Sequence, residues 1–141
     1  MSTRLMDYFN KQPRIGVLST ASKDGKVNAG IFGSPQMIDE KTVVAVFGKN
    51  RTFANLQENP NAVFTIVEQG ELGMMEGWKG VRVYMTMKEY ETSGETLDAY
   101  RREIAGTAGE EAAAMIHASA RFEIGEVRPL IDRGQGWEKS I

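Results

Sequence analysis

Alternation of apolar and polar positions predicts six strands along this chain. The clearest alternation runs from Val81 to Glu89, where Val81, Val83, Met85 and Met87 are separated by polar or charged residues. A period of two is typical of a strand with one face in a core and the other toward solvent. The predicted strands are Arg14–Ala21, Val27–Ile38, Thr42–Phe47, Ala62–Val67, Val81–Glu89 and His117–Ile124.

The first three predicted strands are joined by short turn signals. Asp24-Gly25 is typical of a hairpin turn, whose central residues need positive φ. Residues 39–41 form the next polar turn, so we expect a three-stranded meander. Gly30, Gly33 and Pro35 punctuate the second strand and indicate a bend, a bulge or close packing against bare backbone.

Helical periodicity is confined to short segments. Leu5, Met6 and Phe9 share one side of a first helix that Pro13 closes. A second short helix follows residue 50 and ends at Asn59-Pro60. A third begins at a capping box, Thr92-Ser93-Gly94-Glu95, and Gly106 and Gly109 interrupt it before an Ala-rich turn over Glu110 to Met115. Its apolar stripe consists of Leu97, Tyr100 and Ile104.

These elements predict a mainly β protein, with antiparallel strands and a few helices at the rim. A closed or nearly closed barrel is the natural way to hide the edges of that many strands. The 141 residues suit a single domain, residues 1–141, because we find no internal repeat and no linker between two halves.

Composition excludes several kinds of chemistry. The chain has no cysteine, which removes thiolate catalysis, disulfides and cysteine-based metal sites, and its single histidine, His117, rules out a polyhistidine site. A net charge of −2 gives no indication of the positively charged surface that nucleic-acid binding needs. No apolar run approaches the roughly 18 residues of a membrane span, so we expect a soluble cytoplasmic protein.

The end of the Thr42–Phe47 strand has the outline of an anion site. Gly48 allows close approach of backbone, Lys49 and Arg51 supply positive charge, and Asn50 or Thr52 can cap the helix that follows. The free N–H groups of a helix N-terminus attract anions. A basic loop with an ordinary helix cap has the same sequence pattern, so the pattern alone leaves both interpretations open.

Other chemical arrangements are weak. The serines have no acid and histidine partners for acyl transfer beyond His117, and Glu68, Glu71 and Glu76 fit a solvated face better than an acid–base pair. We expect His117, between Ile116 and Ala118, to be a structural or pocket-lining residue rather than a catalytic residue or haem ligand. No side chain stands out as a proton donor, so the catalytic residues are unknown at this stage.

Three segments together resemble the pyridoxamine 5′-phosphate oxidase-like, FMN-binding split-barrel superfamily. They are residues 25–30 (Gly-Lys-Val-Asn-Ala-Gly), residues 39–44 (Asp-Glu-Lys-Thr-Val-Val) and residues 49–60 (Lys-Asn-Arg-Thr-Phe-Ala-Asn-Leu-Gln-Glu-Asn-Pro). The last of these is the most specific. The resemblance implies a six-stranded antiparallel split β-barrel of the FMN-binding type and a homodimer.

The resemblance also implies a set of cofactor-binding residues. The FMN phosphate would lie at Arg51 and Thr52, with Lys49 and Asn50 as neighbours. The flavin ring would lie along the backbone of Asn28, Ala29, Gly30 and Ile31 on one strand, and of Val46, Phe47 and Gly48 on another. The C-terminal residues 128–137 lack the His of the vitamin B6 oxidases, so that particular activity is not expected.

The expected function is that of an FMN-dependent oxidoreductase with an unidentified substrate. The same helix suits the deazaflavin F420, and a non-enzymatic flavin-binding electron carrier or storage protein fits the same residues. We expect no metal site. Met74, Met75, Trp78 and Trp137 would form an apolar patch in support of the dimer. Trp78, in the Gly-rich loop predicted over Glu68–Gly80, would either cover a flavin or, as we favour, seal the barrel end.

Overall fold

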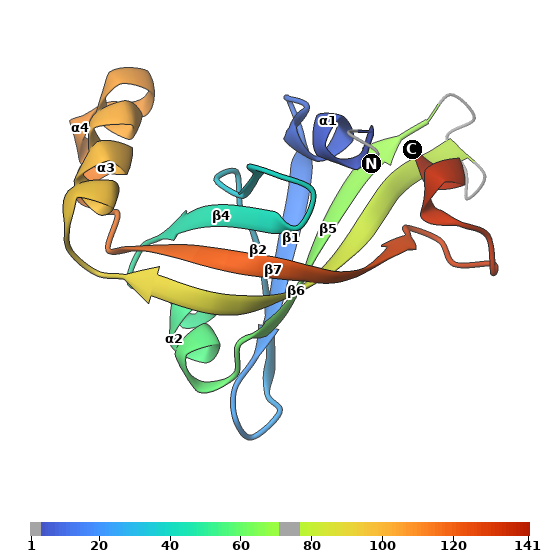
Figure 1. Cartoon of the computed structure of the whole chain (residues 1–141), viewed down its shortest axis with the longest axis horizontal. Coiled ribbons are helices and arrows are strands. Elements are labelled where there is room, and N and C mark those ends of the chain that lie inside the picture. The colour runs from blue at the N-terminus through green and yellow to red at the C-terminus, as the bar shows by residue number, and fades with distance from the viewer. Residues whose placement is uncertain (1–3, 71–76) are drawn as a thin grey trace.

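A computed structural model of the protein describes residues 4–70 and 77–141, and most of its regular structure is antiparallel sheet (Figure 1). The strands are β1 (Ile15–Ala21), β2 (Val27–Ile31), β3 (Gln36–Met37), β4 (Thr42–Phe47), β5 (Asn61–Gln69), β6 (Trp78–Glu91) and β7 (Ala118–Pro129). The helices are α1 (Arg4–Asn10), α2 (Arg51–Glu58), α3 (Glu95–Ala108), α4 (Glu110–Ala114) and the short 3-10 helix η2 (Trp137–Ser140). The mainly β prediction with peripheral helices is confirmed, with seven strands in place of six.

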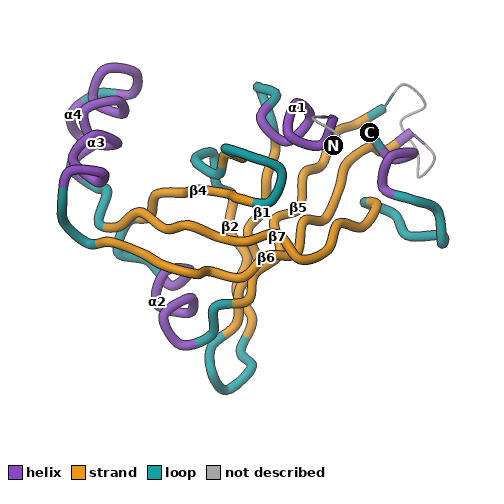
Figure 2. The backbone as a smooth tube through the Cα atoms, in the orientation of Figure 1, coloured by secondary structure: helices purple, strands orange, loops and turns teal. Residues whose placement is uncertain are grey.

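The strands form one sheet in the order β2-β1-β5-β6-β7-β4-β3. Its two edge strands, β2 and β3, are consecutive in sequence and separated only by residues 32–35. In a flat sheet the edges would lie about 29 Å apart, whereas the chain from Ile31 to Gln36 spans at most about 18 Å. The sheet must therefore curl into a barrel, and Figure 2 shows β1 and β5 running across the direction of β4 and β7.

The prediction of one strand over Val27–Ile38 and of a three-stranded meander is wrong. Residues 27–31 pair with β1, whereas Gln36 and Met37 pair with β4. The other edge of β4 pairs with β7, so β4 lies far from β1 in the sheet order. The break falls where Gly33 and Pro35 stand, and Pro35 cannot donate a ladder hydrogen bond.

The core lies inside the barrel, where the alternating positions predicted for β6 meet. Val81, Val83 and Met85 are at most 2 % exposed, as the alternation predicts. Aromatic side chains fill the space between the strands and α2, and Phe47 and Phe53 stack with ring centroids 5.7 Å apart. The largest fully buried side chains include Phe9, Phe47, Phe64, Phe122, Leu18 and Leu56.

Arg14 fastens one end of the barrel. Its guanidinium donates hydrogen bonds to the carbonyl oxygens of Phe9, Gly33 and Pro35 at 2.6, 3.0 and 2.9 Å. The same group lies over the rings of Phe9 and Phe64, at 5.4 and 5.0 Å from their centroids. Burial lowers the pKa of Arg14 from its ordinary value. One side chain thus joins α1, β1 and the linker between β2 and β3.

The loop predicted over Glu68–Gly80 is shorter than expected. Strand β5 continues to Gln69, β6 begins at Trp78, and these two residues pair with each other. Glu71, Met74, Met75 and Glu76 lie outside the described residues. Trp78 is 39 % exposed, so it does not seal the core, while Trp137 is half-buried against the core and does not add to an exposed patch.

The second half differs from the sequence prediction in three further ways. Helix α3 passes through Gly106 and ends only at Ala108, and the capping box does not form, because Gly94 takes the N-cap position without a side-chain hydrogen bond. Strand β7 extends to Pro129, since residues 119–129 pair with β6, with two shifts in register. Among the described residues no helix has the length and apolar character needed to cross a membrane.

The contact between Gly80 and β5 provides a test of the fold. An alanine Cβ at residue 80 would lie 1.8 Å from the carbonyl oxygen of Ile66, and φ there is +150°. We expect Gly80→Ala to lower the free energy of unfolding by about 3 kcal/mol, because backbone strain and overpacking add. Gly125→Ala is the control, since its Cβ would lie 3.9 Å from the nearest atom, and we expect a change within about 0.5 kcal/mol. Equal losses for the two variants in urea denaturation would contradict the packing described here.

Candidate functional site

Helix α2 begins at the residues expected to hold an anion. Asn50 is its N-cap, and the Asn50 side-chain oxygen accepts a hydrogen bond from the backbone N–H of Phe53 at 2.9 Å. Of the two caps that the sequence allows, Asn50 is thus the one used. Phe53 and Leu56 are buried in the barrel and fix the direction of the helix. The cap thus uses the N–H of Phe53, while those of Arg51 and Thr52, in the first turn, have no acceptor within the helix and can face a ligand.

Positively charged side chains lie around this helix start. A hollow of about 630 Å³ next to it is lined by Lys26, Lys49 and Arg51 and contains no Asp or Glu in its lining. None of the ion pairs in the described part of the chain includes any of these three side chains. The local charge is therefore positive, although the whole chain carries a net charge of −2. Such a hollow favours an anionic group.

Two hydrogen bonds hold α2 against the barrel, one to β2 and one to β1. The amide nitrogen of Asn28 donates to the Thr52 hydroxyl at 3.2 Å, which joins β2 to the first turn of α2. Asn55 donates to the Thr20 hydroxyl at 3.1 Å, and both of these side chains are buried. The helix start is therefore held on the barrel from two neighbouring strands.

The end of β4 is joined to the chain that follows β2. The Ser34 hydroxyl both donates to the Val46 carbonyl and accepts from the Val46 N–H, each at 3.1 Å. Direct contacts thus join Asn28 of β2 to the helix start and Ser34, just after β2, to Val46, although β2 and β4 lie far apart in the sheet order. The predicted cofactor-binding residues are Asn28, Ala29, Gly30 and Ile31 on β2, Val46 and Phe47 on β4, and Gly48, Lys49, Asn50, Arg51 and Thr52 at the turn and helix start.

The two glycines expected to admit a flavin make close contacts within the chain. A Cβ at Gly48 would lie 3.2 Å from the carbonyl oxygen of Met115, and one at Gly30 would lie 3.3 Å from the ring of Phe32. Internal packing is therefore sufficient to account for both glycines. Alternate residues of β2 remain open to solvent, including Ala29 and the 77 % exposed Ile31.

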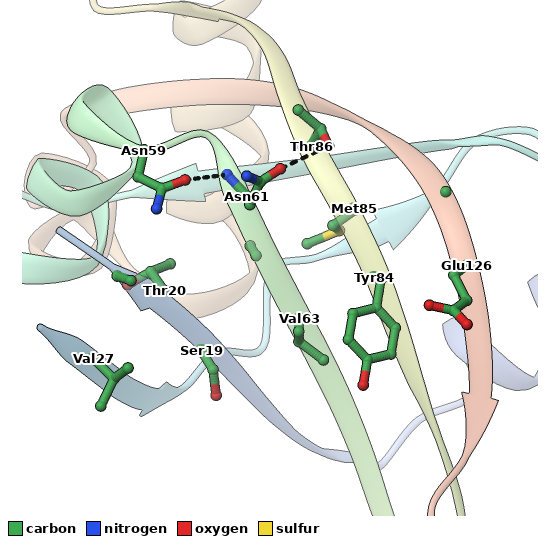
Figure 3. Close-up of a pocket in the computed structure, with 13 residues that line it drawn as sticks. Ser19, Thr20, Val27, Asn59, Asn61, Val63, Tyr84, Met85, Thr86 and Glu126 are labelled. Atoms are coloured by element: carbon green, nitrogen blue, oxygen red, sulfur yellow. Dashed lines mark hydrogen bonds between the residues drawn. The ribbon is translucent and has the colours of Figure 1, made fainter. Parts of the chain in front are cut away.

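A row of side chains across the outer face of the sheet was missed by the sequence analysis. Ser19, Val63, Tyr84 and Glu126 are cross-strand neighbours on β1, β5, β6 and β7. They line a hollow of about 450 Å³, and Figure 3 shows them on successive strands with Val27 of β2 at one end. Alternation along β6 puts Tyr84 on the outer face, but only the sheet register reveals that Ser19 and Glu126 share its row.

His117 lines a third hollow, as the sequence analysis allowed. Its backbone N–H donates to the Phe47 carbonyl at 2.7 Å, which places the residue directly beyond the end of β4. Its half-buried ring stands edge-on to Phe53 at 5.8 Å and 82°. Within residues 4–70 and 77–141, no group of three or more potential metal ligands comes together.

Comparison with known proteins assigns the chain to a family. The pyridoxamine 5′-phosphate oxidase family matches residues 2–130. A comparison with curated protein sequences gave no match.

Solved structures share the fold at low identity. An FMN-binding protein from Syntrophomonas wolfei is 23 % identical, with a TM-score of 0.72 over 92 % of this chain and 84 % of that one. HupZ from Group A Streptococcus is 21 % identical, with a TM-score of 0.71 over 92 % and 94 % of the two chains. An F420 reductase is 12 % identical, with a TM-score of 0.63 over 86 % and 94 %. Because the family match spans nearly the whole chain and its fold agrees, the protein belongs to the pyridoxamine 5′-phosphate oxidase family and has the FMN-binding split-barrel fold.

Proposed function

We propose that this protein binds FMN and acts as an oxidoreductase on a small molecule that is not yet identified. The observation that carries the proposal is the capped start of α2, where Lys26, Lys49 and Arg51 line one hollow without a carboxylate. A phosphate dianion suits a guanidinium fork together with free backbone N–H groups. Arg51 and Thr52 would contact the phosphate, with Lys49 and Asn50 beside it.

The flavin ring would lie along the backbone of residues 28–31 and 46–48. β2 is an edge strand of the sheet, so one row of its backbone groups faces no neighbouring strand, and the carbonyl and nitrogen acceptors of a flat ring need such N–H groups. The bound flavin would supply the redox chemistry, while the chain would bind it, orient it and provide positive charge. We assign no catalytic residue, because no titratable side chain lies among residues 28–31 or 46–48.

Two other functions remain open for the same site. The cofactor F420 also carries a phosphate, and the likeness to an F420 reductase supports that alternative at the level of fold. A non-enzymatic electron carrier or storage protein would need the cofactor and no organic substrate. The absorption spectrum of the purified protein and mass spectrometry of the released ligand would distinguish a flavin from a deazaflavin. The cytoplasmic location expected from the sequence stays a prediction.

We also propose a homodimer through the outer face of β1 and β2. Ile15, Val27 and Ile31 are 57, 84 and 77 % exposed on this face, and cross-strand pairing places Ile31 opposite Val17. Exposed apolar side chains clustered on one sheet face are typical of a surface that another chain covers. A second copy of the chain would cover it, because a two-fold contact brings the same patch of both copies together. This face differs from the patch of methionines and tryptophans that the sequence suggested, of which Met74 and Met75 lie outside the described residues.

The phosphate assignment is tested by Arg51→Ala. We expect its FMN affinity to fall by about 1.5–3 kcal/mol, roughly a tenfold to 150-fold rise in Kd, because a charge-assisted hydrogen bond is lost. Riboflavin lacks the phosphate and should bind the variant and the parent equally. Lys49→Ala should have a smaller effect on FMN, since an exposed ammonium is screened by salt. Quenching of flavin fluorescence measures all of these affinities, and unchanged FMN binding by Arg51→Ala would remove the phosphate from this site.

The dimer is tested by Ile31→Glu. A charge in the centre of an apolar contact between two copies is costly to bury, so we expect the variant to sediment as a monomer at micromolar concentration while the parent sediments as a dimer. Ile38→Glu is the control, because Ile38 is also exposed, at 46 %, but lies beyond β3. A parent protein that is monomeric with FMN bound would refute this part of the proposal.

A further inference from the structure

The hollow lined by His117 is the second of two basic hollows and lies on the other side of the turn that precedes α2. Its volume is about 650 Å³, and it shares Lys49 and Asn50 with the hollow at the helix start. The remaining wall comes from α3, α4 and the chain between α4 and β7, which contribute Arg101, Met115 and His117. The two hollows are therefore neighbours, with Lys49 between them.

The lining of this second hollow is basic. Lys49, Arg101 and His117 contribute to it, and no carboxylate does. Asp98 lies 3.5 Å from Arg101, but both side chains are substantially exposed, and such pairs are worth little. Lys49 takes part in none of the ion pairs found in the described part of the chain. A group that enters the hollow therefore meets positive charge that is not neutralised.

The imidazole of His117 gives a second reason to expect a ligand in this hollow. The ring is half-buried, and among the described residues it takes part in no side-chain hydrogen bond, although its backbone N–H is bonded to Phe47. Its ring nitrogens are open to solvent or to a ligand, because the one buried side-chain nitrogen or oxygen without a partner among the described residues is Nε of Arg14. The one imidazole of the chain, which has no side-chain hydrogen bond to the described residues, thus lines the hollow that already contains Lys49.

Internal contacts hold the wall of this hollow in place. Arg101 donates from Nε and Nη2 to the Ile116 carbonyl at 3.2 and 2.8 Å. Gly48 packs so tightly on the Met115 carbonyl that a Cβ there would lie only 3.2 Å away. His117 is therefore fixed relative to the turn at Lys49, and the hollow has a constant position beside the start of α2.

We propose that this hollow binds the acidic group of a second small molecule, the redox partner of the bound cofactor, and that Lys49 and His117 contact that group. The ligand class is a molecule that carries a carboxylate or a phosphate. Lys49 provides a point charge, and an imidazole nitrogen of His117 donates a hydrogen bond. The proposal rests on the proposed function, because the cofactor is what makes a neighbouring site useful for electron transfer.

The single histidine makes the test direct. In the FMN-loaded protein the Hε1 resonance in the NMR spectrum belongs to His117 without further assignment, because the chain has one histidine. We expect inorganic phosphate or acetate, added at neutral pH and constant ionic strength, to shift this resonance to saturation. Sodium chloride and glycerol should not. The relative affinities for phosphate and acetate identify which acidic group the hollow prefers.

Lys49→Gln tests the proposed contact. We expect the apparent Kd for the preferred anion to rise roughly threefold to tenfold, since one exposed charge is lost. Lys88→Gln is the matched control, because Lys88 is an exposed lysine 3.7 Å from Glu123 on the strands, away from both hollows, and its removal should leave the response unchanged.

Two results would overturn the inference. One is a shift that does not saturate or that sodium chloride reproduces, which would mean that no site exists. The other is loss of the anion response when FMN is loaded, which would mean that the cofactor itself fills the hollow. If the protein does not bind FMN, the proposed function fails, but the hollow can still be tested for anion binding. The His117 response is then measured on cofactor-free Arg51→Ala protein, in which the anion contact at the helix start is removed.

Discussion

The architecture depends on a constraint of chain length. The segment from Val27 to Met37 supplies both edge strands of the sheet, and only four residues separate the two parts. Seven strands cannot lie flat when their edges are joined so closely, so the sheet closes. The Arg14 guanidinium reinforces the closure, because it binds the carbonyl groups of Gly33 and Pro35 within this short link.

Closure also explains why the basic hollows lie where they do. β2 and β4 belong to opposite ends of the sheet order, yet the Ser34–Val46 hydrogen bonds bring the chain after β2 against the end of β4. The turn at Gly48 and the start of α2 therefore rest against β2, where Asn28 reaches Thr52. The positive charge of this region results from side chains that are distant in sequence, Lys26 and Arg51 among them, on a chain of slightly negative net charge.

Features governed by local sequence could be predicted, and features governed by register could not. The strand Thr42–Phe47, the helix after Asn50 with its cap, and the buried positions of β6 all follow from spacing within one segment. The split of Val27–Ile38 depends on β4 pairing with β7, which lies more than 70 residues further along the chain. The row of Ser19, Tyr84 and Glu126 requires three pairings at once, and no periodicity within a segment encodes it. Helix α3 continues through Gly106 because a single glycine costs only about 1 kcal/mol in a helix, which the rest of the helix can offset.

The hydrogen bond between Asn28 and Thr52 gives the helix start a defined orientation. The Thr52 hydroxyl accepts a hydrogen bond from the Asn28 amide, so one of its two lone pairs is occupied and its own hydrogen points away from Asn28. Thr52 is only 3 % exposed, so this bond acts from within the barrel. It ties the first turn of α2 to a strand that is not its neighbour along the chain, and so fixes how the helix is rotated about its axis. The direction in which the N–H groups at the helix start point is thereby set by β2, before any charged side chain of the rim makes contact.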